Sequence, residues 1–316
     1  MNPDAIAVKM GKLKLSNPLL LASGVQGEGL SKVLEALRFG AGAAVTKSIG
    51  SLPRKGYPEP TLVEVDSGWV NAVGLPNPGA EKFSEELKMV KGRFLPIIVS
   101  IFGGDIQEFN AVTKQLDQND FMAYELNLSC PHVEGVGTEV GHKPDLVARI
   151  VRAVKSATKK PVFAKLSPNT DRLIEVAEAA VGAGVDGLTA INTVRAFSVD
   201  IETGRPSLSN KFGGLSGGAI RPVALRAIYE LRERFDVPIM GCGGVSTWEH
   251  AVQFLLTGAN AVQIGSATLR RLDRFNEINA GVLEYMERKG IKSVDRLVGI
   301  AHEKLGKAMQ SVGETS

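Results

Sequence analysis

The chain has 316 residues, of which 44% are hydrophobic and 22% are charged. This balance excludes a disordered chain and supplies enough apolar side chains for a sizeable core. The net charge of +3 is small and dispersed, so we expect no nucleic-acid-binding surface. Two cysteines are too few for a disulfide framework or a four-cysteine metal site, and they favour a reducing, cytoplasmic location.

The N-terminal segment carries Lys9, Lys12 and Lys14, which interrupt any apolar signal core. The longest apolar runs fall far short of the roughly 20 residues that a membrane-spanning helix needs. We therefore expect neither a secretion signal nor a membrane segment.

Short apolar runs alternate with amphipathic segments along nearly the whole chain. Strands are expected at residues 19–22, 43–47, 97–101, 124–129, 162–166, 187–192, 238–241 and 261–265. Helices are expected at residues 30–39, 80–91, 106–116, 144–157, 170–183, 222–235, 247–256 and 274–289. Continuous apolar strands between helices indicate a parallel sheet buried on both faces. This repeated unit predicts an α/β fold, a (β/α)8 TIM barrel, as a single domain over residues 1–316.

Polar residues punctuate the predicted helices. Residues 170–171 and 246–247 are predicted N-caps, and Gly40, Gly184 and Gly258 follow helical runs, where a left-handed cap is favoured. These signals support the helix boundaries.

Two connections, residues 48–79 and 193–221, are too long to be simple turns. Both follow predicted strands, so both lie on the C-terminal face, where barrel active sites are built. The first contains strand-like runs at 62–65 and 69–73 that predict a hairpin, and the second contains the glycine-rich stretch 212–218. We expect these segments to cover a ligand.

Polar side chains end most of the predicted strands or lie within them. They are Ser23, Lys47, Ser48, Ser100, Asn127, Cys130, Lys165, Asn192 and Thr193. A purely structural barrel needs no ionisable group there, so their convergence on one face predicts an active site.

Glycine turns follow the last two strands. Residues 241–246 and 261–267 contain Gly243, Gly244, Gly265 and Ser266. Barrels often bind phosphate with backbone N–H groups at this place. A phosphate-bearing cofactor or a sugar phosphate is therefore expected there, and no Gly-x-Gly-x-x-Gly motif opens a βαβ unit for a dinucleotide.

Lys165 and the two cysteines require separate interpretation. Lys165 lies within an apolar strand, so it either pairs with a negative charge, such as an anionic flavin, or loses its proton and becomes a Schiff-base nucleophile. Cys130 has polar neighbours at a strand end, which favours catalysis, whereas Cys242 beside Met240 reads as a core residue. The histidines flank no carboxylate at ligand spacing, so no metal site is expected.

Five segments together resemble the class 1 dihydroorotate dehydrogenases. They are residues 71–77 (Asn-Ala-Val-Gly-Leu-Pro-Asn), 127–132 (Asn-Leu-Ser-Cys-Pro-His), 164–168 (Ala-Lys-Leu-Ser-Pro), 192–193 (Asn-Thr) and 213–217 (Gly-Gly-Leu-Ser-Gly). The resemblance covers about residues 13–302. It implies an FMN-binding barrel that oxidises dihydroorotate to orotate in pyrimidine (UMP) biosynthesis.

The resemblance also implies a role for each matched residue. Cys130 would remove the C5 proton of dihydroorotate while hydride leaves C6 for FMN. The substrate would be held by Lys47, Asn71, Ala72, Val73, Gly74, Leu75, Asn127, Asn192 and Thr193. FMN would be held by Ser23, Lys47, Ser48, Ser100, Asn127, Lys165, Ile191, Gly217, Gly243, Gly244, Gly265 and Ser266.

Residues 192–193, 200–206 and 213–217 resemble the 1B branch of that class. This branch implies a partner subunit that carries FAD and an iron–sulphur cluster and passes electrons to NAD, with a homodimer of this chain at the core of a heterotetramer. Ser100 stands where the family commonly has asparagine, and residues 194–197 differ from the usual stretch after Asn-Thr.

Three other functions remain open at this level. The barrel could be a flavoenzyme that acts on another pyrimidine or an enone, a Schiff-base aldolase that uses Lys165, or a non-enzymatic flavin store or scaffold. Reduction of a bound flavin by dihydroorotate would favour the predicted activity over another flavoenzyme and over a flavin store or scaffold. Borohydride trapping with substrate would identify the aldolase.

Overall fold

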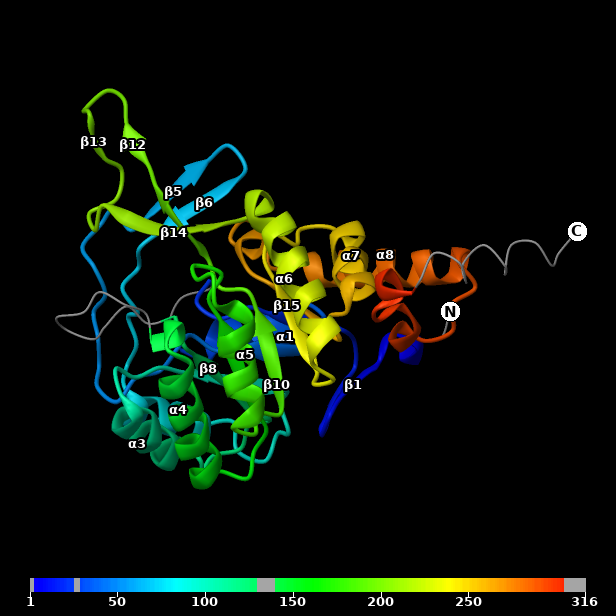
Figure 1. Cartoon of the computed structure of the whole chain (residues 1–316), viewed down its shortest axis with the longest axis horizontal. Coiled ribbons are helices and arrows are strands. Elements are labelled where there is room, and N and C mark those ends of the chain that lie inside the picture. The colour runs from blue at the N-terminus through cyan, green and yellow to red at the C-terminus, as the bar shows by residue number, and fades with distance from the viewer. Residues whose placement is uncertain (1–2, 26–28, 130–139, 304–316) are drawn as a thin grey trace, which may run out of the picture.

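The computed structural model describes residues 3–25, 29–129 and 140–303 (Figure 1). Eight parallel strands form a closed barrel in the order β10-β15-β16-β3-β4-β7-β8-β9. Their bounds are β3 (Leu19–Leu21), β4 (Ala43–Val45), β7 (Ile97–Ile101), β8 (Ala123–Asn127), β9 (Val162–Leu166), β10 (Gly187–Ala190), β15 (Ile239–Cys242) and β16 (Ala261–Ile264). The predicted (β/α)8 barrel is confirmed, and each predicted strand is present.

Eight α-helices alternate with these strands in the described part of the chain. They are α1 (Ser31–Arg38), α2 (Ala80–Lys88), α3 (Ile106–Leu116), α4 (Pro144–Ala157), α5 (Leu173–Gly182), α6 (Arg221–Arg234), α7 (Trp248–Thr257) and α8 (Arg274–Arg288). In α4, the apolar face made by Val147, Ile150, Val151 and Val154 is buried. This helical period brings the apolar face onto the barrel and leaves the polar face outside.

The barrel strands are buried on both faces and form the centre of the core. Every residue of β7 and of β9 is buried, including Ser100 and Lys165. Strands covered on both faces are expected to read as continuous apolar runs, so a polar residue within one is conspicuous. The barrel therefore encloses a few polar side chains in an otherwise apolar interior.

The glycine caps are confirmed, but one predicted N-cap is wrong. Gly40, Gly184 and Gly258 all have positive φ, at 91°, 94° and 118°. Residues 170–171 do not cap α5, because that helix begins at Leu173 after Arg172, and the Thr170 hydroxyl instead accepts a hydrogen bond from the Arg172 backbone N–H at 3.1 Å. Thr247 is the N-cap residue of α7, without a side-chain capping bond.

The two long connections join in a second sheet. The predicted hairpin is present as β5 (Leu62–Val65) and β6 (Gly68–Asn71), and the other connection supplies β11 (Val194–Phe197) and β14 (Phe212–Ser216). All neighbours are antiparallel in the order β11-β14-β6-β5. A small hairpin, β12 (Val199–Asp200) with β13 (Arg205–Pro206), projects beyond this sheet (Figure 1). The two connections that we expected to cover a ligand therefore form one antiparallel sheet.

The remaining elements are short. β1 (Val8–Met10) and β2 (Leu13–Leu15) form an antiparallel hairpin. Six 3-10 helices complete the described chain: η1 (Pro3–Ile6), η2 (Val140–His142), η3 (Gly218–Ile220), η4 (Ser266–Thr268), η5 (Val294–Leu297) and η6 (Ile300–His302). Among the helices of the described residues, none is both long and apolar enough to cross a membrane.

Candidate active site

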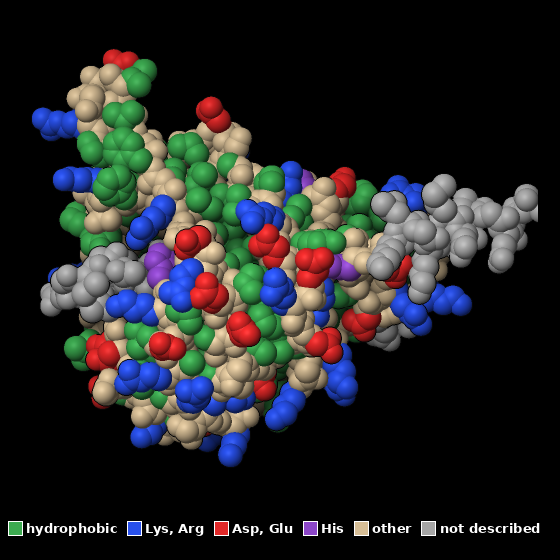
Figure 2. All heavy atoms as spheres, in the orientation of Figure 1, with side chains coloured by type: hydrophobic (Ala, Val, Ile, Leu, Met, Phe, Trp, Pro, Cys, Tyr) green, Lys and Arg blue, Asp and Glu red, His purple; other side chains and the backbone are tan. Residues whose placement is uncertain are grey.

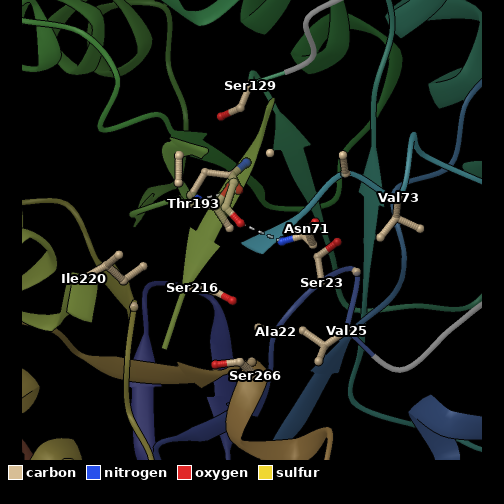
Figure 3. Close-up of a pocket in the computed structure, with 18 of the residues that line it drawn as sticks. Ala22, Ser23, Val25, Asn71, Val73, Ser129, Thr193, Ser216, Ile220 and Ser266 are labelled. Atoms are coloured by element: carbon tan, nitrogen blue, oxygen red, sulfur yellow. Dashed lines mark hydrogen bonds between the residues drawn. The ribbon is translucent and has the colours of Figure 1, made fainter. Parts of the chain in front are cut away.

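A cavity of about 1010 Å³ opens at the C-terminal ends of the barrel strands and reaches the second sheet. Figure 3 shows residues from both parts around it, among them Ser23, Asn71, Thr193 and Ser266. The structure brings together here Ser23, Lys47, Ser48, Asn71, Ala72, Val73, Gly74, Leu75, Asn127, Lys165, Ile191, Asn192, Thr193, Gly217, Gly243, Gly244, Gly265 and Ser266. These residues include nearly all of the predicted site.

The structure does not place two predicted site residues at the cavity wall: one lies behind it, and the other is outside the described residues. Ser100 is fully buried and shares a hydrogen bond of 2.9 Å with Ser48, so direct contact with a ligand is not borne out for it. Its hydroxyl instead supports Ser48, which does line the cavity. Cys130 lies outside the described residues, although Ser129, its chain neighbour, lines the cavity.

Three amide and hydroxyl side chains form a hydrogen-bonded row along the cavity. Asn127 donates to the Ser48 hydroxyl at 3.1 Å, and its side-chain oxygen accepts from the Asn192 amide at 3.3 Å. The Asn192 oxygen in turn accepts from the Thr193 backbone N–H at 2.8 Å. These bonds fix the orientation of both amide groups, so the cavity presents donors and acceptors in set directions, as recognition of a planar polar molecule requires.

The segment after β6 is held tightly at the cavity wall. Asn71 donates to the Gly214 carbonyl at 3.0 Å, which ties the first connection to the second (Figure 3). Gly74 has φ of 79°, and a Cβ there would lie 2.7 Å from the Tyr57 backbone nitrogen. Asn77 donates to the Leu75 carbonyl at 3.0 Å, so this loop is anchored from beneath. A glycine is required where the loop turns past Tyr57.

Lys165 meets a buried carboxylate that the sequence interpretation missed. Its ammonium nitrogen lies 3.4 Å from Glu125 Oε1 and donates to Gln263 Oε1 at 3.3 Å. Burial lowers the pKa of Lys165, but the charges of Glu125 and Cys242 and the bond with Glu125 raise it, leaving the pKa above its usual value. Of the two predicted states, the structure therefore favours the ion-paired ammonium.

Glu125 was detectable by the reasoning that singled out Lys165. Both are lone charged residues within apolar strands, and burying either without a partner is costly. Gln263 in β16 and Thr189 in β10 gave a weaker signal, because neutral polar residues occur in buried strands without a special role. Both donate to Glu125 Oε2, at 2.6 and 3.0 Å.

Glycine turns form the opposite end of the cavity. Gly243 and Gly244 have φ of 138° and 77°, and a Cβ at Gly244 would lie 2.5 Å from the Gly217 carbonyl oxygen. Gly265 and Ser266 follow β16 beside them and line the same cavity. Because Gly243, Gly244 and Gly265 have no side chains, the backbone of these turns is accessible from the cavity, as in phosphate-binding sites of barrels.

Cys242 is not a simple core residue, which corrects its interpretation from the sequence. It lines the cavity beside Lys165 and is partly exposed. Burial raises the pKa of its thiol, and Lys165 offsets this only in part, so the neutral thiol is favoured. Among the described residues, no group of three or more His, Cys, Asp and Glu side chains is arranged to hold a metal ion.

The mouth of the cavity contains residues that the sequence did not indicate. Tyr57, Asn169, Arg195, Phe197 and Phe212 all line it. Phe197 and Phe212 contact each other with ring centroids 5.8 Å apart. Nothing in a single sequence shows that strands separated by so many residues will pair, so these positions depend on tertiary structure.

The chain is thus an α/β barrel protein with a large cavity at the C-terminal ends of its strands, where barrel enzymes have their active sites. A sequence profile described as dihydroorotate dehydrogenase matches residues 5–286, and the chain belongs to the dihydroorotate dehydrogenase family. Two similar relatives are the catalytic subunits of dihydroorotate dehydrogenase B (NAD(+)) from Pyrococcus abyssi and Thermococcus kodakarensis. The first is 50% identical and covers 94% of this chain and 99% of its own length, and the second is 48% identical and covers 96% and 100%.

A solved structure supports the fold independently. A crystal structure of dihydroorotate dehydrogenase from Eimeria tenella, in complex with ferulenol, superposes with a TM-score of 0.82. It is 21% identical and covers 95% of this chain and 89% of its own. At this identity the similarity supports the barrel fold alone.

Proposed function

We propose that this chain oxidises (S)-dihydroorotate to orotate with FMN as the bound cofactor, a step of pyrimidine biosynthesis. The observation that carries the proposal is one cavity that is lined by fixed amide groups and, at its other end, by glycine turns. Its volume of about 1010 Å³ lies at the upper end of ordinary ligand sites, which suits a tricyclic ring together with a small planar substrate. Family membership and the B-type relatives support the same reaction.

The residues fit FMN at both ends of the molecule. The glycine turns at Gly243–Gly244 and Gly265–Ser266 suit its phosphate, and Ser23, Ile191 and Gly217 line the space between. The Lys165 ammonium suits the edge of the ring that becomes negative on reduction. When bound, FMN would supply the acceptor for the hydride from C6 of the substrate.

The substrate would occupy the part of the cavity nearest the second sheet. Lys47 supplies a positive charge for its carboxylate, and Asn71, Asn127 and Asn192 supply amide donors and acceptors for its ring. Residues 72–75 form the adjoining wall, and Thr193 completes it. Because Asn127, Asn192 and Thr193 are linked to one another by hydrogen bonds, these groups need little ordering on binding.

Cys130 is proposed as the base that takes the C5 proton of dihydroorotate onto its sulfur as the C5–H bond breaks. It follows Ser129, which lines the cavity, and the ordered amide of Asn127. A general base must lie within hydrogen-bond reach of the proton it removes, and Ser129, the described residue next to Cys130 in the chain, lines the cavity.

The alternative of a Schiff-base aldolase is disfavoured. An amine nucleophile must be unprotonated, whereas Lys165 is ion-paired with Glu125 and its pKa is raised. The deciding experiment is to purify the chain, identify its chromophore by mass spectrometry and add dihydroorotate without oxygen. Rapid bleaching of bound FMN supports the proposal, whereas bound FAD or no bleaching contradicts it.

Electron transfer to NAD is proposed to require a second subunit that carries FAD and an iron–sulphur cluster. The relatives are named as catalytic subunits of an NAD(+) enzyme, and this chain has only two cysteines, too few for a four-cysteine cluster. The isolated chain should reduce artificial dyes with dihydroorotate but reduce NAD negligibly. Fast NAD reduction by the chain alone would overturn the requirement, and efficient fumarate turnover would contradict the B-type assignment.

A further inference from the structure

Beneath the cavity, the barrel interior holds a carboxylate that the proposed reaction does not use. Glu125 is fully buried and lies outside the set of residues that line the cavity, whereas Lys165, 5% exposed, reaches into it. Charged residues are almost never fully buried unless they are paired. The position of Glu125 behind Lys165 therefore calls for a specific role.

The hydrogen bonds of Glu125 are divided between its two oxygens. Oε2 accepts from Gln263 Nε2 at 2.6 Å and from Thr189 Oγ1 at 3.0 Å. Oε1 has no hydrogen-bond partner among the described residues and faces the Lys165 ammonium at 3.4 Å. Two neutral donors from β10 and β16 thus fix the carboxylate, while its other oxygen is directed at the cation.

Gln263 completes the arrangement by contacting both charged groups. Its amide nitrogen donates to Glu125, and its oxygen accepts from the Lys165 ammonium at 3.3 Å. The orientation of the amide is therefore determined by its two partners. Lys165 is held from behind by one anion and one dipole, with its ammonium at the cavity surface.

We propose that Glu125 is a positioning residue that keeps Lys165 protonated and fixes its ammonium at the cavity, so that a constant positive charge faces the bound flavin. This inference rests on the proposed FMN site. The chemical reason is that burial without an anion removes the charge of a lysine: buried lysines without a partner can have pKa values of about 5–6. Gln263 and Thr189 serve Glu125 by holding its carboxylate in place.

The groups around Lys165 allow a test by pH. Glu125 on β8 and Cys242 on β15 are the titratable groups that act on its ammonium, whereas Gln263 and Thr189 do not titrate. Burial raises the pKa of Cys242, so its thiol stays neutral near pH 7. A step in flavin properties between pH 5 and 9 in a Glu125 variant would then report on Lys165.

The experiment is a potentiometric titration of the FMN-bound chain with a chemical reductant and a reference dye at several values between pH 5 and 9. The midpoint potential of Glu125→Gln is compared with wild type at each pH, so that proton uptake by the flavin itself cancels. As pH rises and Lys165 loses its proton, the preference for reduced flavin should fall in the variant by about tenfold, or about 30 mV for a two-electron couple. A difference that stays constant over this range would overturn the inference.

Three matched variants assign the step. Glu125→Gln/Lys165→Met removes the titrating amine and should abolish it, and Glu125→Asp retains the anion and should show none. Glu125→Gln/Cys242→Ala should keep the step, and its loss there would assign it to the thiol and overturn the inference.

If Glu125→Gln does not fold, nitrogen-15 lysine NMR of the wild-type protein provides the test. The resonance assigned by Lys165→Arg should remain that of an ammonium up to pH 9. A resonance of a neutral amine below pH 9 would overturn the inference.

The outcomes separate this inference from the proposed function, because the titration uses no dihydroorotate. A chain that binds FMN and shows the Glu125-dependent step but is not reduced by dihydroorotate would overturn the reaction and support the role of Glu125. A chain that is reduced by dihydroorotate but shows no such step would support the reaction and overturn the role of Glu125. A chain that binds no FMN would overturn both.

Discussion

The floor and the mouth of the cavity differ in burial and in the elements that form them. At the floor, Glu125, Lys165 and Gln263 are buried, and their polar contacts come from strands of one closed barrel. At the mouth, Phe197 and Phe212 are 52% and 67% exposed, and they belong to a sheet made by two inserted connections. Figure 2 shows hydrophobic side chains gathered over this projecting region, while charges are dispersed over the helices.

The floor therefore affects the chemistry of the bound ligands, whereas the mouth affects access to the cavity. Every strand of the barrel is fixed by two neighbours, so a charge at the floor has few positions to adopt and its electrostatic effect is strong in a dry interior. The mouth is fixed by fewer buried contacts, so it can differ in sequence without loss of the barrel. Variants in the two regions should therefore fail in different ways.

The largest effect is expected for substitution of Cys130, the proposed base. Cys130→Ala should retain bound FMN but lose dihydroorotate oxidation by about 10²–10⁴-fold, because general-base catalysis contributes about that much. Cys130→Ser should keep part of the activity. Stopped-flow flavin reduction measures both, and Cys242→Ala is the matched control, expected to lose far less. A wild-type rate in Cys130→Ala would remove the assignment.

Loss of the floor cation should appear in stability as well. Lys165→Met leaves the Glu125 carboxylate buried without its counter-charge, and breaking such a pair costs about 3–5 kcal/mol. Lys155→Met is the control, because its pair with Asp186 is about one-third exposed and contributes about 1 kcal/mol or less. Urea denaturation of the flavin-free proteins measures the difference.

A double variant sharpens this stability test. Glu125→Gln/Lys165→Met removes both charges and should recover much of the loss caused by Lys165→Met alone. Additive losses would show that the two side chains do not depend on each other, and the floor would then not act as one unit.

The polar residues at the strand ends and the two connections that cover them were predictable from the sequence, whereas the contacts beneath the cavity and the pairing of the two connections were not. Periodicity located the strands, and polar residues at strand ends such as Asn127 and Asn192 converge because parallel strands end on the same face. The partner of Lys165 was missed although Glu125 lies in an apolar run, because charge pairing across a barrel has no sequence spacing. Pairing of β14 with β6 was also hidden, since residues 212–216 contain two glycines, which are poor strand formers.

Those glycines have a structural reason that can be tested at the mouth. A Cβ on Gly214 would collide with the Thr193 hydroxyl, and Gly in a strand often marks such a close approach. Gly214→Ala should displace Thr193 and lower kcat/KM for dihydroorotate by on the order of 10²-fold, the effect of misplacing a binding group by about 1 Å.

FMN binding should change far less than kcat/KM in Gly214→Ala, because the added Cβ collides with Thr193, which we assign to the substrate and not to the flavin. Gly218→Ala is the control, because a Cβ there meets only the Ser67 carbonyl oxygen at 3.6 Å, an ordinary contact. Steady-state kinetics with a dye acceptor and flavin titration measure the two properties. Equal losses in both variants would show that the collision with Thr193 is not the cause.

The smallest effect is expected at the exposed aromatic pair of the mouth. Phe212 is 67% exposed and contacts Phe197 in a tilted arrangement, so Phe212→Ser should lower the free energy of unfolding by about 1 kcal/mol or less. Phe109→Ala on α3, where the ring is fully buried, should cost about 3–5 kcal/mol. Urea denaturation compares the two variants. A loss at Phe212 as large as that at Phe109 would mean that the mouth is covered in the free chain by a second copy, and the denaturation midpoint would then depend on protein concentration.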